Sequence, residues 1–151
     1  MTKLNWLIKA FKDLSTDELF DMYYLRQEVF VVEQQCPYQD CDEMDKHAYH
    51  LFAYDNDILV AYLRIIEPGF NYHEASIGRV VTKPSYRGLG LGKGLMEKGL
   101  IHVKSLFDNP HIRISAQQYL IPFYESLEFV TVGEGYLEDD IPHIEMVYRV
   151  E

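Results

Sequence analysis

The residues most suggestive of chemistry are four glycines at positions 88, 90, 92 and 94, which directly follow Arg87. A run rich in β-branched residues ends before them at Pro84, and apolar residues recur after them at helical spacing. Glycine lets a backbone approach a ligand closely, and the free N–H groups at a helix start bind anions. A helix that bound nothing would gain little from glycines, each of which costs about 1 kcal/mol relative to alanine. The stretch therefore predicts a strand, a turn that binds a di- or polyphosphate, and a helix.

Two common phosphate-binding motifs do not fit this spacing. A P-loop needs Gly-x-x-x-x-Gly-Lys-Ser/Thr, but counting back from Gly92 and Lys93 puts Arg87 at the first glycine, and Gly94 replaces the hydroxyl residue. A dinucleotide fingerprint needs Gly-x-Gly-x-x-Gly, which none of the glycines completes. The pattern that does fit is Arg-x-x-Gly-x-Gly, formed by Arg87, Gly90 and Gly92.

The charge distribution also favours an anionic ligand at this turn. The net charge of −10 and the isoelectric point near 5.0 argue against nucleic acid or an anionic membrane as the main partner. Residues 79–104 depart from this pattern, because they contain six basic residues against Glu97 alone, a balance of +5 that leaves −15 for the rest of the chain. A positive region in an acidic protein suits an anionic cofactor beside a cationic acceptor.

The overall composition is that of one globular domain over residues 1–151. A chain of 151 residues that is 48% hydrophobic has enough apolar material for a core of that size. The first residues lack a signal peptide's apolar segment, and no run is long enough to span a membrane. We therefore expect a cytoplasmic protein in which Cys36 and Cys41 stay reduced.

The elements before the glycines begin with a strand at residues 4–11. Ser15 and Glu18 form a capping-box pattern, so a helix is expected from there to about Val32 or Glu33. A hairpin follows, with strands at 50–54 and 58–66, and the strand at 75–82 leads into the glycine-rich turn.

The elements after the turn begin with a helix whose apolar face is expected to form core. That face consists of Leu95, Met96, Leu100, Val103, Leu106 and Phe107. After a break at 109–110, we expect strands at 111–116 and 129–132, a short helix at 119–127, an acidic loop at 133–140 and a closing strand at 143–150. This order predicts an α+β fold with a mixed sheet flanked by helices.

The acidic segment at 34–47 is long for a loop, which suggests a functional role. Its candidate zinc ligands are Cys36, Cys41, His47 and His50. Their spacing departs from that of zinc fingers, so this site is kept only as a minor alternative. The aspartates at 40, 42 and 45 lack the third oxygen ligand and the glycine of a calcium loop. No metal is expected.

Three features together resemble the GNAT superfamily of N-acetyltransferases over essentially the whole chain. They are the loop from Arg87 to Gly92 after a strand, the segment from Phe123 to Phe129, and the order of strands and helices. More narrowly, residues 29–42, 77–81, 115–117 and 141–144 resemble the ElaA-like subgroup.

The resemblance implies a GNAT acyl-CoA N-acyltransferase fold in which strand 76–82 splays from strand 112–117. The pantetheine arm of acetyl-CoA would lie between these strands, and the glycine-rich loop would hold the pyrophosphate. Gln117 would offer a polar side chain to the cofactor, and Tyr124 would lie near the thioester sulfur. The implied cofactor-binding residues are Val80, Val81, Thr82, Arg87, Gly88, Leu89, Gly90, Leu91, Gly92, Lys93, Gln117 and Tyr124.

The chemistry of amide formation assigns further roles. An amine must lose a proton before it attacks a thioester, which requires a general base. Many relatives carry a glutamate where this chain has Gly78, so the candidate bases are His143, Glu33 and His50. The resemblance also implies that the Val80 amide stabilises the oxyanion and that Tyr124 protonates the departing thiolate. Tyr124, His143 and Glu33 are thus the predicted catalytic residues.

The expected function is acetyl transfer from acetyl-CoA to a primary amine by direct attack. Glu33 and the acidic residues 40–45 would attract a cationic acceptor, unless the latter are simply a solvated charge run. A covalent role for Cys36 has no support from spacing. The alternative is a CoA-binding or regulatory module without turnover, which the absence of a glutamate at Gly78 leaves open. A homodimer is also possible.

Overall fold

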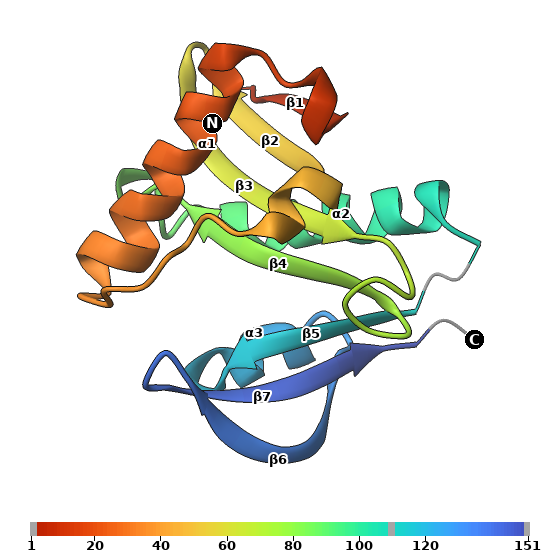
Figure 1. The fold of residues 1–151 in the computed structure, drawn as a ribbon. Helices are drawn as coiled ribbons and strands as arrows, with labels where there is room; N and C mark the ends of the chain where they lie inside the picture. Colours follow the sequence, from red (N-terminus) through yellow and green to blue (C-terminus); the bar gives the residue numbers. More distant parts are fainter. Residues whose placement is uncertain (1–2, 109–110, 150–151) are drawn as a thin grey trace.

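The computed structural model describes residues 3–108 and 111–149 and contains one seven-stranded mixed sheet. Its strands are β1 (Asn5–Ala10), β2 (Tyr49–Asp55), β3 (Ile58–Ile66), β4 (Ala75–Thr82), β5 (Ile112–Gln117), β6 (Val130–Glu138) and β7 (Ile141–Tyr148). They lie in the order β1-β2-β3-β4-β5-β7-β6. The predicted α+β fold with a mixed sheet is confirmed, and the two halves of the sheet are visible in Figure 1.

The sheet opens between its two halves because β4 and β5 pair only where they begin. Ala75 lies opposite Ile112 and Ser76 opposite Arg113, in parallel register, and no later residues of the two strands pair. All other neighbouring strands are antiparallel. The predicted splay of strands 76–82 and 112–117 is therefore present, and it leaves the later parts of β4 and β5 free to line a cleft.

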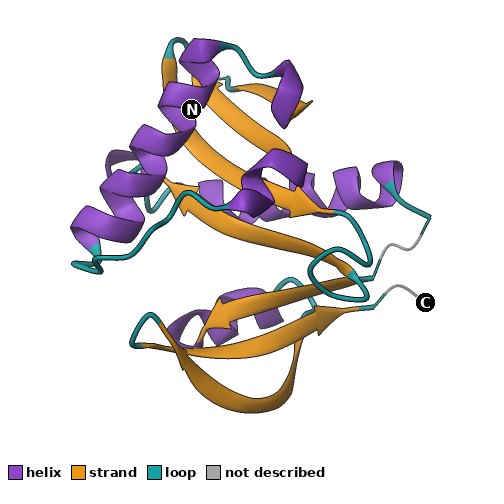
Figure 2. Cartoon of the chain, in the orientation of Figure 1, coloured by secondary structure: helices purple, strands orange, loops and turns teal. Residues whose placement is uncertain are grey.

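Helices cover both faces of the sheet (Figure 2). The α-helices are α1 (Thr16–Arg26), α2 (Leu91–Leu106) and α3 (Ile121–Glu125). A π-helical segment, η2 (Gln27–Glu33), continues α1, so the helical prediction to about residue 33 is correct in extent but not in winding. The 3₁₀ segments are η1 (Phe11–Asp13), η3 (Glu43–His47), η4 (Pro84–Tyr86) and η5 (Gln118–Leu120). Among the described residues, no helix has the length and apolar character needed to cross a membrane.

Two apolar clusters fasten these helices to the sheet. The larger one joins α2 and α3 to the strands through residues such as Leu95, Leu63 and Tyr124. The smaller one lies on α1's side, where Met22 packs with Phe52. β3 is buried along nearly its whole length, as expected for a central strand covered on both faces.

The capping box predicted at the start of α1 is present. The Glu18 amide donates to Ser15 Oγ at 3.0 Å, and the Ser15 amide donates to the Glu18 carboxylate at 2.8 Å. Lys9 on β1 also reaches Glu18 at 2.9 Å. The helix start is therefore fixed by local sequence and tied to the first strand.

Two sequence predictions about the elements are wrong. Residues 133–140 are not a loop, because β6 continues to Glu138 through an irregularity between Val132 and Tyr136, and only Asp139 and Asp140 form the turn. β6 is an edge strand and largely exposed, so polar residues and glycine are tolerated in it. Leu106 does not join the core, since 36% of it is exposed at the end of α2. The predicted break at 109–110 and the end of the closing strand at 150 lie outside the described residues.

Candidate active site

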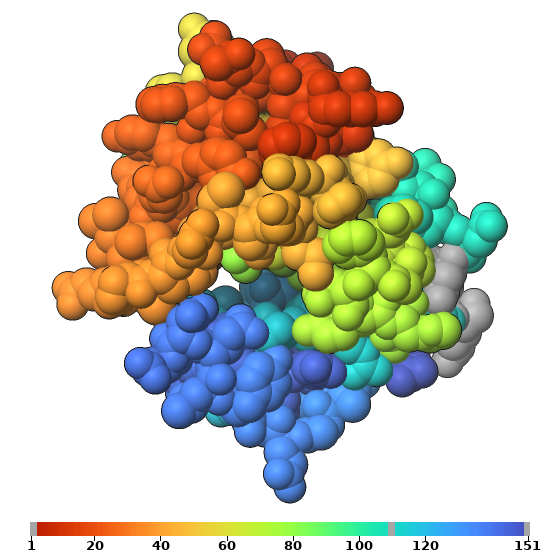
Figure 3. Space-filling view, in the orientation of Figure 1, coloured from red at the N-terminus to blue at the C-terminus, as the bar shows by residue number. Residues whose placement is uncertain are grey.

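A cleft of about 600 Å³ lies where β4 and β5 diverge, which is within the usual size range of small-molecule sites. Figure 3 shows it as a hollow between the orange segment near residue 35 and the blue β6–β7 hairpin. β4 contributes residues 77–82, and β5 contributes Ile114, Ser115 and Gln117. Helical segments contribute Phe30, Glu33, Phe123 and Tyr124, and the β6–β7 hairpin contributes Glu138, Asp139 and His143. Of the predicted site residues, the cleft is lined by Glu33, Val80, Val81, Thr82, Arg87, Gly92, Gln117, Tyr124 and His143.

The glycine-rich loop leads into α2 in a conformation that glycine favours. Gly88 and Gly90 have φ values of +83° and +76°, and Gly90 is the N-cap of the 16-residue helix. A Cβ at either position would meet nothing within 4 Å, so the loop presents an open surface. The first amides of α2, at Leu91, Gly92 and Lys93, have no acceptor within the helix. An anionic pyrophosphate fits this arrangement.

Arg87 and Glu33 face each other at the edge of the cleft and form a two-pronged ion pair. Arg87 Nη1 lies 2.7 Å from Glu33 Oε2, and Nη2 lies 2.6 Å from Oε1. The hydrogen bonds from Arg87 lower the pKa of Glu33. A carboxylate held in this way is a weaker base, so the geometry argues against the predicted catalytic role of Glu33. Glu33 is instead paired with Arg87, which directly precedes the glycine-rich loop.

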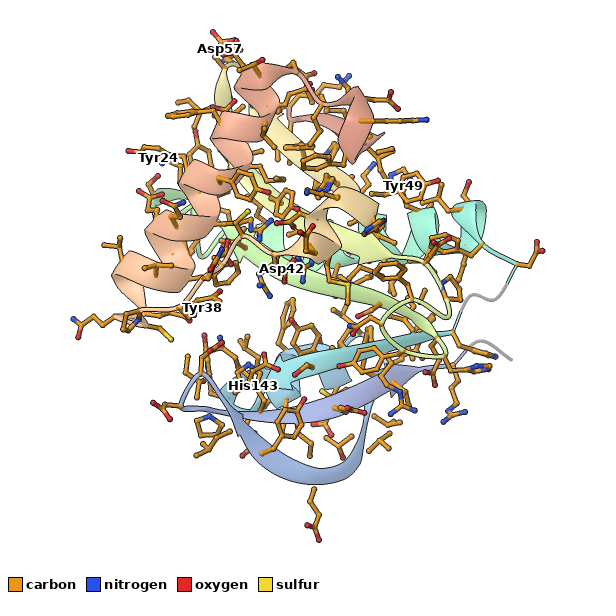
Figure 4. The ribbon with its side chains drawn as sticks, in the orientation of Figure 1. Tyr24, Tyr38, Asp42, Tyr49, Asp57 and His143 are labelled. Carbon is orange, nitrogen blue, oxygen red and sulfur yellow. The ribbon has the colours of Figure 1, made fainter. Side chains whose placement is uncertain are left out.

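His143 is better arranged to accept a proton. It is 6% exposed, and its Nδ1 lies 2.7 Å from the carbonyl oxygen of Ile141. Because a carbonyl only accepts, Nδ1 carries the hydrogen in the neutral ring and Nε2 keeps its lone pair. Nε2 lies 3.5 Å from a Glu138 carboxylate oxygen. Figure 4 shows His143 on the half of the molecule opposite Tyr38 and Asp42, facing the gap.

The position of His50, the third candidate base, argues against that role. It is fully buried and does not line the cleft. Its Nδ1 lies 2.6 Å from the Tyr62 hydroxyl and its Nε2 lies 2.9 Å from the carbonyl oxygen of Asp45. Burial lowers its pKa. Both ring nitrogens are thus occupied, one by Tyr62 of β3 and the other by the main chain of Asp45.

Tyr124 is buried at the bottom of the cleft, with 7% of its surface exposed. Its ring packs edge-on against Phe123 and Phe129, at centroid distances of 5.1 and 5.8 Å. Burial raises the pKa of its hydroxyl to about 12, so the group is protonated at neutral pH and can donate a hydrogen bond. Gln117 lies across the cleft from Gln34, with its Nε2 3.5 Å from the Gln34 side-chain oxygen.

The three aspartates of the acidic segment at 40–45 are paired internally, so for them both predictions, attraction of a cation and a solvated charge run, are wrong. Glu43 of the same segment has a side chain 82% exposed. The aspartates pair with arginines in a group that we call the Arg–Asp cluster, consisting of Arg26, Arg64, Arg79, Asp40, Asp42 and Asp45. Arg26 reaches Asp40 at 2.7 Å and Asp45 at 2.8 Å. Arg64 reaches Asp42 at 2.7 Å and Asp45 at 2.9 Å. The carboxylates are therefore neutralised inside the protein.

Asp45 at the centre of this cluster makes a prediction about acid stability. Burial alone would raise its pKa, but the guanidinium groups of Arg26 and Arg64 outweigh burial and lower the pKa from 3.8 to about 2. The carboxylate therefore stabilises the fold above about pH 4, and this contribution is lost as the pH falls toward 2. The shift corresponds to about 2 kcal/mol. Asp45→Asn should lower the free energy of unfolding by at least this amount at pH 7.

Urea unfolding measured between pH 7 and pH 2.5 tests this expectation. The gap between wild type and Asp45→Asn should narrow as the pH falls below 4. Asp57→Asn is the control, because Asp57 is exposed in the β2–β3 turn (Figure 4) and should leave stability unchanged. A gap of constant size down to pH 2.5 would contradict the ion-pair explanation.

β4 contains a bulge that the sequence analysis missed. Tyr62 pairs with Val81 and Arg64 with Gly78, so Arg79 and Val80 both lie opposite Leu63. Arg79 has a φ of +52°, which is uncommon for a residue other than glycine. The available sequence signal was Gly78, because a glycine inside a strand often marks a bulge.

Gly78 also bears on the missing glutamate. A Cβ added there would lie 3.9 Å from Arg64 Nε, which is buried and has no hydrogen-bond partner among the described residues. A glutamate at this position would extend toward that guanidinium, and a neighbouring cation lowers a carboxyl pKa. A carboxylate base introduced at this position would therefore be weakened in this chain.

The cleft is also lined by polar residues that were not predicted from the sequence, among them Tyr38, Ser115, Glu138 and Asp139. Ser115 donates toward Glu138 at 3.3 Å, and Cys36 Sγ lies 3.5 Å from the carbonyl oxygen of Asp139. Glu138 and Asp139 were not predicted to line the site because residues 133–140 were predicted to be a loop. No alternation of apolar and polar residues continues past Gly133, so the sequence contains no clear signal for the longer strand.

The structure does not bring the minor zinc alternative together. His50 is occupied as described above, and the His47 ring packs on Phe70 at 4.7 Å. Cys36 is buried, whereas Cys41 is exposed. Within residues 3–108 and 111–149, no group of three or more His, Cys, Asp or Glu side chains is arranged to hold a metal ion.

Comparisons with known proteins agree with this geometry. The family model described as an acetyltransferase (GNAT) domain matches residues 12–150. The crystal structure of an acyl-CoA N-acyltransferase from Pseudomonas aeruginosa is similar with a TM-score of 0.93 and 44% identity, and the match covers 98% of this chain and 100% of that one. ElaA from Escherichia coli is 38% identical over 149 residues, covering 97% of each chain. Its crystal structure has a TM-score of 0.91 and covers 98% of this chain and all of its own.

A more distant structure shares the fold alone. It is an aminoglycoside 6′-N-acetyltransferase complexed with coenzyme A, with 18% identity and a TM-score of 0.69. The match covers 94% of this chain and 96% of that chain.

Proposed function

The chain belongs to the acetyltransferase (GNAT) family, and from that premise we propose that it transfers an acetyl group from acetyl-CoA to a primary amine by direct attack on the thioester. The observation that carries the proposal is the cleft between β4 and β5. It extends from the glycine-rich start of α2 to His143, so one continuous space would serve both an anionic donor and an amine.

The donor would be held by main-chain groups. The amides from Gly88 to Lys93 would bind the pyrophosphate, and Arg87 would add a charged contact. Main-chain groups of Val80, Val81 and Thr82 would bind the pantetheine arm between the splayed strands, with Gln117 on the opposite strand. The coenzyme A in the aminoglycoside acetyltransferase supports CoA use by this fold.

The residues of the cleft would then divide the chemistry among them. His143 Nε2 takes a proton from the amine, directly or through one water, as the amine nitrogen bonds to the carbonyl carbon. The Val80 amide stabilises the negative charge that develops on the carbonyl oxygen. The carbon–sulfur bond then breaks, the sulfur leaves with the electron pair, and the Tyr124 hydroxyl transfers its proton to that sulfur. His143 releases the amine proton to solvent, and solvent returns a proton to Tyr124. The products are an N-acetylated amine and the thiol of CoA.

Tyr124→Phe should therefore lower kcat by about 10²-fold while CoA affinity stays close to wild type. Phenylalanine keeps the ring packing against Phe123 and Phe129 and removes only the hydroxyl. Steady-state kinetics and calorimetric CoA binding measure the two quantities separately. Tyr24→Phe is the control, because Tyr24 is 59% exposed on α1 and lies outside the cleft. Unchanged kcat in Tyr124→Phe would remove the donor role.

The acceptor is proposed to be a small polyamine-like molecule, an amino sugar or a peptide amine. Other acidic residues than those at 40–45 are proposed to attract it, because the Asp residues at 40–45 form ion pairs inside the protein. Glu138 and Asp139 take their place, because both line the cleft near His143 and neither forms an ion pair with Lys or Arg among the described side chains. They favour a cationic acceptor over a neutral or anionic one.

The first experiment is thiol release from acetyl-CoA in the presence of a panel of amines, with CoA binding measured by thermal shift in parallel. Release that depends on one amine class would support the transferase and identify the acceptor. CoA binding without release for any amine would favour a non-catalytic CoA-binding module. Absence of CoA binding would overturn the proposal.

A further inference from the structure

The bulge in β4 lies inside the cleft and has a strained backbone. Contacts from other parts of the chain must hold this conformation. Arg79 adopts a φ of +52° although it carries a full side chain, and the next residue is Val80. Such conformations persist where surrounding contacts over-determine them, and they concentrate at functional sites. Val80 lines the cleft, so the bulge decides where its amide points.

The contacts that hold Arg79 come from a segment far away in the sequence. Arg79 Nη2 donates to the Asp40 carbonyl oxygen at 2.9 Å and to Asp42 Oδ2 at 3.2 Å. Arg79 Nε also lies 2.8 Å from Asp40 Oδ1, close enough for an ion pair but not aligned for a hydrogen bond. Its guanidinium lies over the Tyr38 ring, 5.8 Å from the centroid. Several contacts thus hold the side chain of Arg79, the strained residue, in one position.

The aspartates that hold Arg79 are themselves immobilised. Arg26 of α1, which is fully buried, holds Asp40 through Nε at 2.7 Å and through a second bond to the Asp40 carbonyl oxygen at 2.8 Å. Arg64 of β3 holds Asp42 with contacts of 2.7 and 3.2 Å. The position of Arg79 is therefore fixed, through Asp40 and Asp42, by side chains of helix α1 and of the central strand β3.

We propose that Arg79 is a positioning residue for acetyl transfer. Its guanidinium, held by Asp40 and Asp42, keeps the β4 bulge in the conformation that directs the Val80 amide at the carbonyl oxygen of the bound thioester. The acidic segment thereby acts on the reaction through the backbone, without touching the acceptor. The inference rests on the proposed function, because it assigns the bulge a role in activating acetyl-CoA.

The test uses the infrared spectrum of acetyl-CoA carrying a ¹³C-labelled acetyl carbonyl, which reports a hydrogen bond to that oxygen and needs no acceptor. Wild type should shift the carbonyl stretch to lower frequency on binding. Arg79→Lys keeps the charge but loses the forked geometry, so the shift should shrink. Its kcat with the amine identified by the panel should fall by about 10²-fold, as expected for loss of one oxyanion donor, while acetyl-CoA affinity stays close to wild type.

Arg113→Lys is the matched control. Arg113 lies on β5, pairs with Glu74 and Glu145, and has a side chain 19% exposed against 21% for Arg79, but it does not line the cleft. It should keep the full carbonyl shift and kcat. Asp42→Asn provides a second variant should Arg79→Lys fail to fold, and it should also reduce the shift.

The outcomes separate the two proposals. A wild-type carbonyl shift retained in folded Arg79→Lys and Asp42→Asn would overturn the positioning role and leave the proposed function standing. An equal loss of shift in Arg113→Lys would also overturn it, because the effect would then be a general consequence of losing an ion pair. Failure of wild type to bind acetyl-CoA would overturn the proposed function and this inference together.

Discussion

His143→Gln is expected to lower kcat by about 10²- to 10⁴-fold while CoA affinity stays close to wild type. Glutamine approximates the size of the ring and can still donate to the Ile141 carbonyl oxygen, but it cannot take a proton. The affinity should hold because His143 is not among the predicted CoA contacts, which lie on β4, in residues 87–93, and at Gln117 and Tyr124. Turnover with the best amine of the panel and calorimetric CoA binding measure the two effects.

The pH dependence of this variant distinguishes a base from a residue that merely shapes the cleft. Without a base, only the small fraction of amine already deprotonated can react. The activity of His143→Gln should therefore rise about tenfold per pH unit up to the amine pKa, about 10.4 for an alkylamine, and approach that of wild type. His73→Gln is the control, because His73 is exposed and does not line the cleft. A deficit that stays constant with pH would exclude His143 as the base.

Gly90→Val is expected to abolish measurable acetyl-CoA binding. The φ of +76° at this position is unfavourable for a side chain, and most of all for a β-branched one. Valine should therefore change the loop path and move the free amides at the start of α2. Calorimetry should register the loss as at least a tenfold weaker affinity, equivalent to about 1.4 kcal/mol.

Two comparisons make the Gly90 test specific. Gly94→Ala also changes a glycine of the first turns, but its φ is not positive and a Cβ there meets nothing within 4 Å, so binding should persist. Pantetheine lacks the pyrophosphate, so any affinity for it should be the same in Gly90→Val and wild type. Wild-type CoA affinity in Gly90→Val would refute the assignment of the pyrophosphate to this loop.

The glycine-rich loop could be predicted from the sequence more fully than the proposed base, His143. The loop depends on local rules: glycines at the positions with positive φ, an arginine before them and a helix after them. His143 is different, because nothing around it in the sequence shows that its Nδ1 is held by Ile141 or that it faces the cleft. The resemblance to the GNAT superfamily identified the fold, but Gly78 meant that it could not identify the base.

The errors have a common origin in interactions between distant residues. The aspartates at 40, 42 and 45 look like a free acidic run, yet their partners Arg26, Arg64 and Arg79 lie 14 to 39 residues away. Glu33 looks like an available carboxylate, yet Arg87 occupies it from 54 residues away. Residues 133–138 look like a loop by composition, but pairing with β7 keeps them extended.

The sequence by itself determined most of the strands, the capped helix and the glycine-rich turn with its positive charge, because these follow from periodicity, capping chemistry and glycine, all of which act between neighbours. Only the tertiary structure decided which charged side chains form ion pairs inside the protein and which face the cleft. It also placed Asp40 and Asp42 against Arg79, the residue with positive φ in the β4 bulge. Ion pairs and backbone strain depend on three-dimensional distances between residues that are far apart in the chain, and the spacing of residues along the sequence does not reveal these distances.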